Sequence, residues 1–394
     1  MHPPTVKTGL DILARDDFAP LRGQRIGLVA NPAAVDARLR HAADLLFTSR
    51  TVRLDALFGP EHGFGAEAQD LIGVADGRHP RYGCPVHSLY GDSVASLRPR
   101  PDMLRGLDAL VIDLPDIGSR YYTFQATMLF CLETAAAAGL SVFVLDRPNP
   151  LNGVAIEGPV IQCGFESFVG IHSVPTRHGL TLGELARLYV AERQIDIALR
   201  VVEVEGWARD QYFDQTGLPW VLPSPNMPTL DTAIVYPGQC LLEGTNLSEG
   251  RGTTRPFELC GAPWIDPYRL ARRLGDLPLP GVVFRPVTFR PTFHKFAGQT
   301  CGGVQLHVSD RAAFRPVRTG VALLAAFRTE DPERFRWRTE PYEFVADRPA
   351  IDLLFGGSRE RLALEAALRV EDLVRPWADH EAAFRVRREP YLLY

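Results

Sequence analysis

The sequence lacks the signatures of the common nucleotide- and metal-dependent enzymes. No G-x-G-x-x-G follows a strand-like segment, no G-x-x-x-x-G-K-[ST] occurs, and the G-x-S-x-G of many serine hydrolases is missing. H-E-x-x-H is also absent, and no two of the ten histidines stand four residues apart. Dinucleotide binding, P-loop chemistry and zinc catalysis are therefore unsupported, and we expect no metal and no cofactor.

Cysteine pairs, basic blocks and long apolar runs are missing as well. The six cysteines are far apart, without any C-x-x-C, which favours buried thiols over a disulfide frame. The net charge is −4 with no long basic block, so we expect no nucleic-acid or membrane partner. No run is long enough to span a bilayer, and residues 1–7 hold no signal-peptide core. We therefore expect a cytoplasmic protein acting on small substrates; the sequence does not indicate the oligomeric state.

What the first half does contain is a regular alternation of apolar strands and amphipathic helices. Near-continuous apolar strands separated by helices are typical of a parallel sheet covered on both faces. The predicted fold class is therefore α/β, with a doubly wound, mostly parallel sheet. The expected strands are residues 25–30, 52–56, 85–90, 108–113, 140–146 and 198–204, and the expected helices are 37–49, 123–138 and 181–193.

Polar side chains follow each of the first five predicted strands. In a doubly wound sheet these positions share the edge where ligands bind. Glu61 and His62 follow the second strand, directly after a Gly-Pro turn, and two glycines leave room beside them. A solvated loop glutamate is the plainer interpretation of Glu61, but convergence of several clusters favours a functional one. The other residues of these clusters are Asn31, Tyr90, Asp113, Asp116, Arg120, Asp146, Arg147 and Asn149.

The second half has a different pattern of residues and predicts a second, mixed α+β domain. Residues 206–228 contain four prolines and read as a linker or a cleft wall. Residues 243–255 are polar and glycine-rich, so they predict either a solvated loop or backbone brought close to a polar ligand. We expect one domain over residues 1–205 and another over 206–394. The expected strands are 282–284, 287–289 and 303–308, and the expected helices are 312–327 and 360–370.

The surplus of carboxylates, arginines and tyrosines at the sheet edge is the inventory of carboxylate-catalysed glycosidic cleavage or of sugar binding. Six stretches of the sequence also resemble a bacterial family of NamZ-type exo-β-N-acetylmuramidases, formerly a family of unknown function. Together they cover most of the chain from about residue 27 to 308. These stretches are residues 57–64, 116–123, 144–151, 177–184, 223–228 and 243–254.

The resemblance implies release of N-acetylmuramic acid (MurNAc) from the non-reducing end of peptidoglycan fragments, without a cofactor. It implies a Rossmann-like domain and a second α/β domain, with the active site in the cleft between them. Glu61 matches the family's proposed catalytic glutamate, and we interpret it as the general acid. Its partner carboxylate is open among Asp116, Glu243 and Glu249, each of which could equally serve a structural ion pair or loop cap. If the substrate's N-acetyl group is the nucleophile, the partner need only orient it.

The remaining site residues are expected to bind substrate. Arg251 is the first choice for gripping the lactyl carboxylate of MurNAc, with Arg120 and Arg147 as alternatives. Tyr122 and Asn226 could bind sugar hydroxyls, and His62, Asn149, Glu243 and Asn246 complete the predicted set. Two other functions stay open at this point: a muropeptide-binding protein without turnover, and a hydrolase of another amino sugar on the same scaffold.

Overall fold

The N-terminal part of the chain is built on a sheet that is almost entirely parallel. The computed structural model describes residues 6–65 and 77–394, so residues 1–5, within the stretch used to exclude a signal peptide, lie outside it. Within the described residues, seven strands pair in the order β3-β4-β2-β1-β5-β6-β7, and β3–β4 is the antiparallel pair. The strands are β1 (Arg25–Ala30), β2 (Arg53–Gly59), β3 (Gly77–Arg78), β4 (Pro85–Ser88), β5 (Ala109–Asp113), β6 (Ser141–Leu145) and β7 (Leu199–Val202).

Helices cover both faces of this sheet, because alternate strand residues point to opposite sides. In β5, Val111 belongs to the core under α1 (Gly9–Arg15) and α2 (Ala42–Thr48). Its neighbour Ile112 belongs to the core under α3 (Phe124–Ala137) and α4 (Leu182–Glu192). The predicted α/β, doubly wound fold is therefore confirmed.

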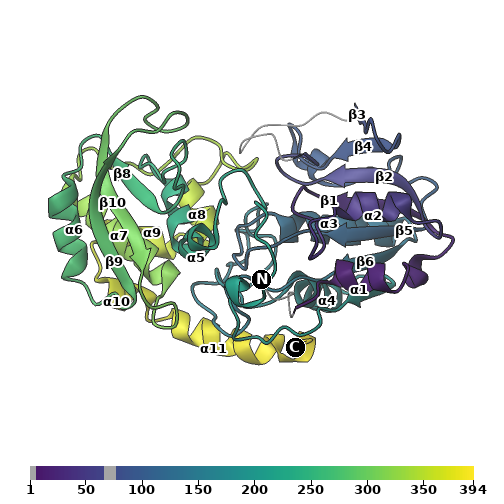
Figure 1. Ribbon diagram of the computed structural model, residues 1–394. Helices are drawn as coiled ribbons and strands as arrows, with labels where there is room; N and C mark the ends of the chain where they lie inside the picture. Colours follow the sequence, from purple (N-terminus) through teal and green to yellow (C-terminus); the bar gives the residue numbers. More distant parts are fainter. Residues whose placement is uncertain (1–5, 66–76) are drawn as a thin grey trace.

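The C-terminal part carries a second, smaller sheet (Figure 1). Three antiparallel strands pair in the order β8-β10-β9: β8 (Leu259–Ala262), β10 (Cys301–Val308) and β9 (Val282–Phe289). The helices are α5 (Leu230–Gln239), α6 (Pro267–Gly275), α7 (Pro316–Glu330), α8 (Ala350–Phe355), α9 (Arg359–Glu365), α10 (Val370–Val374) and α11 (Trp377–Arg388). A Cβ added at Gly238 would lie 1.9 Å from Pro316 O, so glycine lets α5 and α7 cross closely.

Several element boundaries differ from the prediction. The two expected strands 282–284 and 287–289 are one strand, β9, which runs through Pro286. The expected helix 360–370 is divided between α9 and α10, and the helix expected from residue 312 begins at Pro316. Elements α1, α5, α6, α8, α11, β3 and β8 were not predicted. In α5 the residues Thr232 to Gln239 are all buried, so the helix has no alternation of apolar and polar faces that would indicate it.

Residues 206–229, which we call the strap, connect the two parts without a strand. The strap touches both: Asn31 Nδ2 donates to Pro223 O at 2.7 Å, and Tyr212 OH donates to Arg311 O at 3.0 Å. The division of the chain after residue 205 stays a prediction. All six cysteines are free thiols, and all but Cys163 are buried.

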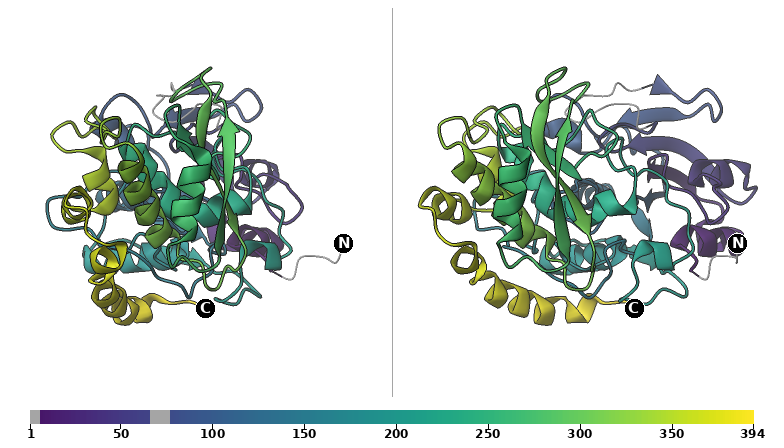
Figure 2. Two further views of the ribbon diagram at one scale, coloured as in Figure 1. Left: turned by 90° about the vertical axis from the view of Figure 1, so that its left-hand side faces the viewer. Right: turned by 60° about the vertical axis from the view of Figure 1, so that its left-hand side comes forward.

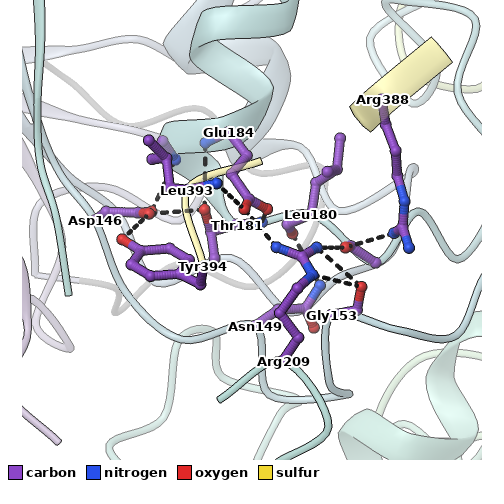
Figure 3. A network of polar contacts seen from close by, with 12 residues as sticks. Asp146, Asn149, Gly153, Leu180, Thr181, Glu184, Arg209, Arg388, Leu393 and Tyr394 are labelled. Carbon is purple, nitrogen blue, oxygen red and sulfur yellow. Dashed lines mark hydrogen bonds and ion pairs between the residues drawn. The ribbon is translucent and has the colours of Figure 1, made fainter. Parts of the chain in front are cut away.

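The end of the chain returns to the N-terminal part. Helix α11 runs along the lower side of the molecule from one part to the other (Figures 1 and 2). Tyr394 OH then donates to Asp146 Oδ2 at 2.8 Å, and Leu393 N donates to Glu184 Oε1 at 2.9 Å (Figure 3). These bonds tie the C-terminal part to the first sheet and so help to fix the two walls of the space between them. Among the described residues, no helix has the length and apolar character needed to cross a bilayer.

Candidate active site

The loop after β2 is folded back tightly on the end of its own strand. A Cβ added at Gly59 would lie 2.3 Å from Phe64 N, and Gly63 N donates to Pro60 O at 2.9 Å. His62 has a φ of 72° and Gly63 a φ of 84°, both in the left-handed region. The turn keeps Glu61 buried at 8% exposure, so it is not a solvated loop residue.

Glu61 is held by the start of helix α3. Thr123 Oγ1 donates to Glu61 Oε2 at 2.7 Å, and Thr123 is the residue before the first helical turn. Within the described part of the chain, Oε1 of Glu61 receives no hydrogen bond from protein. One carboxyl oxygen is therefore fixed by Thr123, and Glu61 lines a pocket.

This pocket, which we call the cleft pocket, lies between the two parts of the molecule. Glu61, Tyr122 and Thr123 come from the N-terminal part, Asn226 comes from the strap, and Arg251 comes from the C-terminal part. Its full lining is Glu61, His62, Tyr121, Tyr122, Thr123, Phe124, Val169, Ser224, Asn226, Met227, Tyr236, Glu243, Arg251, Phe257, Tyr342 and Glu343. Six predicted site residues meet here: Glu61, His62, Tyr122, Asn226, Glu243 and Arg251.

Glu243 and Arg251 form a buried ion pair in the wall of the cleft pocket. Arg251 Nη1 donates to Glu243 Oε1 at 2.8 Å, and Tyr342 OH donates to Glu243 Oε2 at 2.7 Å. Burial and the charge of Glu243 raise the pKa of the Tyr342 hydroxyl well above its usual value, so it stays a proton donor. Because both of its oxygens are engaged, Glu243 is placed to orient Arg251.

Glu249 does not line the cleft pocket. Its carboxylate meets Lys295 Nζ at 2.9 Å, His294 Nδ1 at 3.1 Å and Arg251 Nη1 at 3.5 Å. Burial alone would raise its pKa, but the charge of Lys295, the hydrogen bond with His294 and the charge of Arg251 hold the pKa of Glu249 well below its usual range. Glu249 therefore does not share a pocket with Glu61, and its contacts support the structural ion pair that the sequence had left open as the other interpretation.

Three predicted binding residues are used in packing instead. Arg120 is 1% exposed, and its guanidinium donates to Pro159 O at 2.6 Å and to Leu354 O at 2.7 Å. Asn149 Nδ2 donates to Leu180 O at 2.9 Å. Asn246 is hydrogen-bonded to the backbone of residues 334–336: its side chain donates to Arg334 O at 2.8 Å and accepts from Arg336 N at 3.0 Å. None of the three lines the cleft pocket.

Asp116 and Arg147 line a separate cavity at the edge of the sheet. Arg147 grips Asp113 with two hydrogen bonds, from Nε at 2.6 Å and from Nη2 at 2.9 Å. Asp116 Oδ2 accepts from Gly118 N at 2.6 Å, and His178 Nε2 lies 3.7 Å away. Burial raises the pKa of Asp116 to about 7, and burial with nearby arginines lowers the pKa of His178 to about 3. Asp116 therefore shares its site with a neutral imidazole rather than with Glu61.

The raised pKa of Asp116 gives a testable pH dependence. An acid whose pKa is raised by folding stabilises the protein fully below its unfolded pKa, and this contribution is lost as pH rises through the folded value of about 7. Asp116→Asn should remove that loss, so between pH 4.5 and 7.5 its free energy of unfolding should fall less than that of the wild type, by about 3 kcal/mol. Urea unfolding at both pH values measures this. The exposed Asp92→Asn is the control and should keep the wild-type difference.

Glu343 is a pocket carboxylate that the sequence did not indicate. Tyr90 OH, from the N-terminal part, donates to Glu343 Oε2 at 3.1 Å. Glu343 and Phe344 have φ values of 46° and 68°, and Phe344 packs on Tyr90 with ring centroids 5.6 Å apart. Left-handed backbone at two consecutive residues that are not glycine is unusual and tends to occur at functional sites. Thr123, Ser224, Phe257 and Tyr342 also line the cleft pocket without having been predicted.

Comparisons with known proteins agree along the whole chain. The family model for the N-terminal region of exo-beta-N-acetylmuramidase NamZ matches residues 26–231, and the model for the C-terminal region matches residues 234–394. The peptidoglycan beta-N-acetylmuramidase NamZ of Bacillus subtilis (strain 168) is 44% identical over 391 residues, which is 99% of this chain and 92% of that protein.

Solved structures show the same fold. A crystal structure of a DUF1343 family protein from Bacteroides fragilis NCTC 9343 superposes with a TM-score of 0.90 at 34% identity, covering 99% of both chains. A second DUF1343 family protein from the same organism gives a TM-score of 0.77 at 26% identity, again covering 99% of both chains.

Proposed function

Because this chain belongs to the NamZ family of exo-β-N-acetylmuramidases, it is a glycoside hydrolase that releases MurNAc from peptidoglycan fragments, and we propose that Glu61 is its general acid. The family resemblance predicted from the sequence is thereby confirmed. We propose that the substrate is a MurNAc-containing saccharide cleaved at its non-reducing end, as the family resemblance implies.

The observation that carries the role of Glu61 is the way its two oxygens are used. Thr123 fixes Oε2 at 2.7 Å, Oε1 has no hydrogen bond from the described part of the chain, and Glu61 lines the cleft pocket. A glycosidic oxygen is a poor leaving group, so an acid must protonate it as the bond breaks. A carboxyl group that is fixed by one oxygen and open at the other meets this need, because it can deliver the proton in one defined direction.

The other lining residues suit a muramoyl sugar. Phe257 and Tyr236 are packed edge to face, with ring centroids 4.7 Å apart, and offer apolar surface to the C–H face of a pyranose ring. Asn226 and Ser224 supply polar groups for hydroxyls. Arg251 provides a cation for the lactyl carboxylate, the group that distinguishes MurNAc from N-acetylglucosamine (GlcNAc).

The second carboxylate of the reaction is best assigned to Glu343. Asp116 and Glu249 lie outside the cleft pocket, and Glu243 already accepts hydrogen bonds at both oxygens. Glu343 lines the cleft pocket on the C-terminal wall, on a left-handed backbone that only its surroundings can maintain. We assign it the task of orienting the nucleophile, either a water molecule or the substrate's own N-acetyl group.

The test is whether the protein releases free MurNAc from a MurNAc-GlcNAc disaccharide, which chromatography measures over time. The matched control is the GlcNAc-MurNAc disaccharide, which presents the wrong sugar at its non-reducing end and should stay intact. A binding protein without turnover would retain the first disaccharide and release nothing. Faster cleavage of a β-GlcNAc glycoside than of a β-MurNAc glycoside would instead identify a hydrolase of another amino sugar.

A further inference from the structure

The cavity that contains Asp116 and Arg147 lies at the point where the strand order of the first sheet reverses. Strands β2 and β4 lie on one side of β1, while β5, β6 and β7 follow on the other. The cavity is lined by residues that come directly after β1, β5 and β6, among them Ala33, Asp116 and Arg147. The crevice at such a switch point is where open α/β sheets bind their ligands. We call it the switch-point cavity.

Residues of the strap line one side of the switch-point cavity and give it a largely apolar surface. Trp220 and Phe213 both line it, with ring centroids 5.1 Å apart and ring planes at 89°. The indole of Trp220 is held in place, because Nε1 donates to Met227 O at 3.2 Å. Fixed aromatic surfaces of this kind pack well against the C–H face of a sugar ring.

The charged residues around this cavity are already compensated by protein partners. Arg147 is paired with Asp113, and Asp36 is paired with Arg40 at 2.6 Å. An anionic ligand would therefore meet no uncompensated cation in a partly buried site, and its desolvation would be costly. Asp116 offers little to a cation, because burial raises its pKa to about 7 and so disfavours its charged form. The cavity therefore suits an uncharged ligand.

Two polar groups in the switch-point cavity are left to bind such a ligand. The Asp116 side chain is 6% exposed, and its Oδ1 is buried without a hydrogen-bond partner in the described part of the chain. Arg147 uses Nε and Nη2 for its protein contacts, so Nη1 can donate to another acceptor. A buried acceptor without a donor costs free energy, which a hydroxyl or amide N–H of a ligand would recover.

The switch-point cavity lies next to the cleft pocket. Pro223 lines the first and Ser224 the second, and consecutive Cα atoms are about 3.8 Å apart. Burial raises the pKa of Tyr122. The carboxylates of Asp116, in the switch-point cavity, and Glu61, in the cleft pocket, raise this pKa further. Tyr122 therefore stands within electrostatic range of both sites.

We propose that the switch-point cavity binds the leaving sugar, a neutral N-acetylhexosamine such as GlcNAc, while the cleft pocket holds MurNAc. This inference rests on the proposed function, since a leaving sugar exists only if the glycosidic bond is cleaved at Glu61. Asp116 accepts from a hydroxyl or the N-acetyl amide of the leaving sugar, Arg147 donates to it, and Trp220 packs on its ring.

The test compares two substrates that differ only in the leaving group: the MurNAc-GlcNAc disaccharide and methyl β-MurNAc, whose methyl group is too small to reach the cavity. Val221→Phe adds a ring in the lining of the switch-point cavity without removing a polar group. Leu222→Phe is the matched control, because Leu222 is 46% exposed and does not line the cavity.

Val221→Phe should lower kcat/KM for the disaccharide about tenfold or more and change that for the methyl glycoside by less than about twofold. Saturation-transfer NMR should detect GlcNAc binding to the wild type and to Leu222→Phe, and a much weaker signal with Val221→Phe. If the Phe variant does not fold, Val221→Leu makes a smaller change and should shift the substrate ratio in the same direction.

Three results would overturn the proposal in distinguishable ways. If Val221→Phe leaves the ratio of kcat/KM for the disaccharide to kcat/KM for the methyl glycoside as in the wild type, the assignment of the cavity is wrong while the hydrolase function stands. If GlcNAc binds equally well to Val221→Phe, the leaving sugar lies elsewhere. If the wild type releases MurNAc from neither substrate, the proposed function fails together with the inference.

Discussion

Glu61→Gln should lower kcat on a MurNAc-GlcNAc disaccharide by on the order of a hundredfold or more. The glutamine keeps the shape of the side chain and can still accept the hydrogen bond from Thr123, which reaches Glu61 Oε2 at 2.7 Å. It has no proton to give to the glycosidic oxygen, so bond breaking should slow while MurNAc binding is kept. Steady-state kinetics and calorimetric titration with MurNAc measure the two effects separately.

The leaving group provides an internal check on this role. A nitrophenolate needs little protonation, so the loss in Glu61→Gln should be much smaller on nitrophenyl β-MurNAc than on the disaccharide. Thr123→Val is the matched comparison: it leaves the acid in place, removes the bond that fixes it, and should cost about tenfold on the disaccharide and less on the nitrophenyl glycoside. Near-normal turnover of the disaccharide by Glu61→Gln would exclude Glu61 as the acid and turn attention to Glu343.

The sheet and the position of Glu61 could be predicted because their signals are local. Apolar strands such as residues 108–113 and the helix at 123–138 are visible in short windows of sequence, and β5 and α3 fall within a residue of them. The Gly-Pro turn after β2 marks the point where the strand stops and places a carboxylate at the ligand edge of the sheet. A polar residue that follows a strand can therefore be located before its environment is known.

The environment of the other strand ends could not be predicted. The rule that ligands bind at the carboxyl edge treats all strand ends alike. In the structure the strap covers the ends of β1, β5 and β6, so Asp116 and Arg147 line the switch-point cavity beside the cleft pocket rather than the cleft pocket itself. The strap has no periodic pattern, so its path depends on long-range contacts such as the bond from Asn31 to Pro223.

The C-terminal wall of the cleft pocket was the hardest part to predict. The bond between Tyr90 and Glu343 joins residues 253 positions apart, and neither residue stands in a recognisable motif. The left-handed backbone at Glu343 and Phe344 could not be predicted, because neither residue is a glycine or an asparagine. Arg251 and Glu243 were predicted because glycines and charges crowd their loop. The same pattern could not distinguish them from Glu249, since only the structure shows the ammonium of Lys295 beside it.

Arg251→Ala should weaken MurNAc binding about thirtyfold, which corresponds to about 2 kcal/mol, and leave GlcNAc binding nearly unchanged. The two sugars differ by the lactyl carboxylate, and Arg251 is the arginine that lines the cleft pocket in the described part of the chain. Its guanidinium lies 5.0 Å from the ring centroid of Phe257, and Nη1 is anchored on Glu243 at 2.8 Å. A planar group oriented in this way can grip a carboxylate with parallel hydrogen bonds.

Removing Arg251 also leaves Glu243 buried with Tyr342 as its hydrogen-bond donor, so a general loss of stability has to be separated from a loss of recognition. The double variant Arg251→Ala/Glu243→Gln removes the ion pair as a unit and should show the same selective loss for MurNAc. Arg255→Ala is the matched control, because its side chain lies four residues further along the same loop and is 46% exposed. Calorimetric titrations in the Glu61→Gln background give the dissociation constants without turnover. An equal loss of affinity for MurNAc and GlcNAc would show that Arg251 braces the pocket wall and that the lactyl carboxylate is bound by another residue.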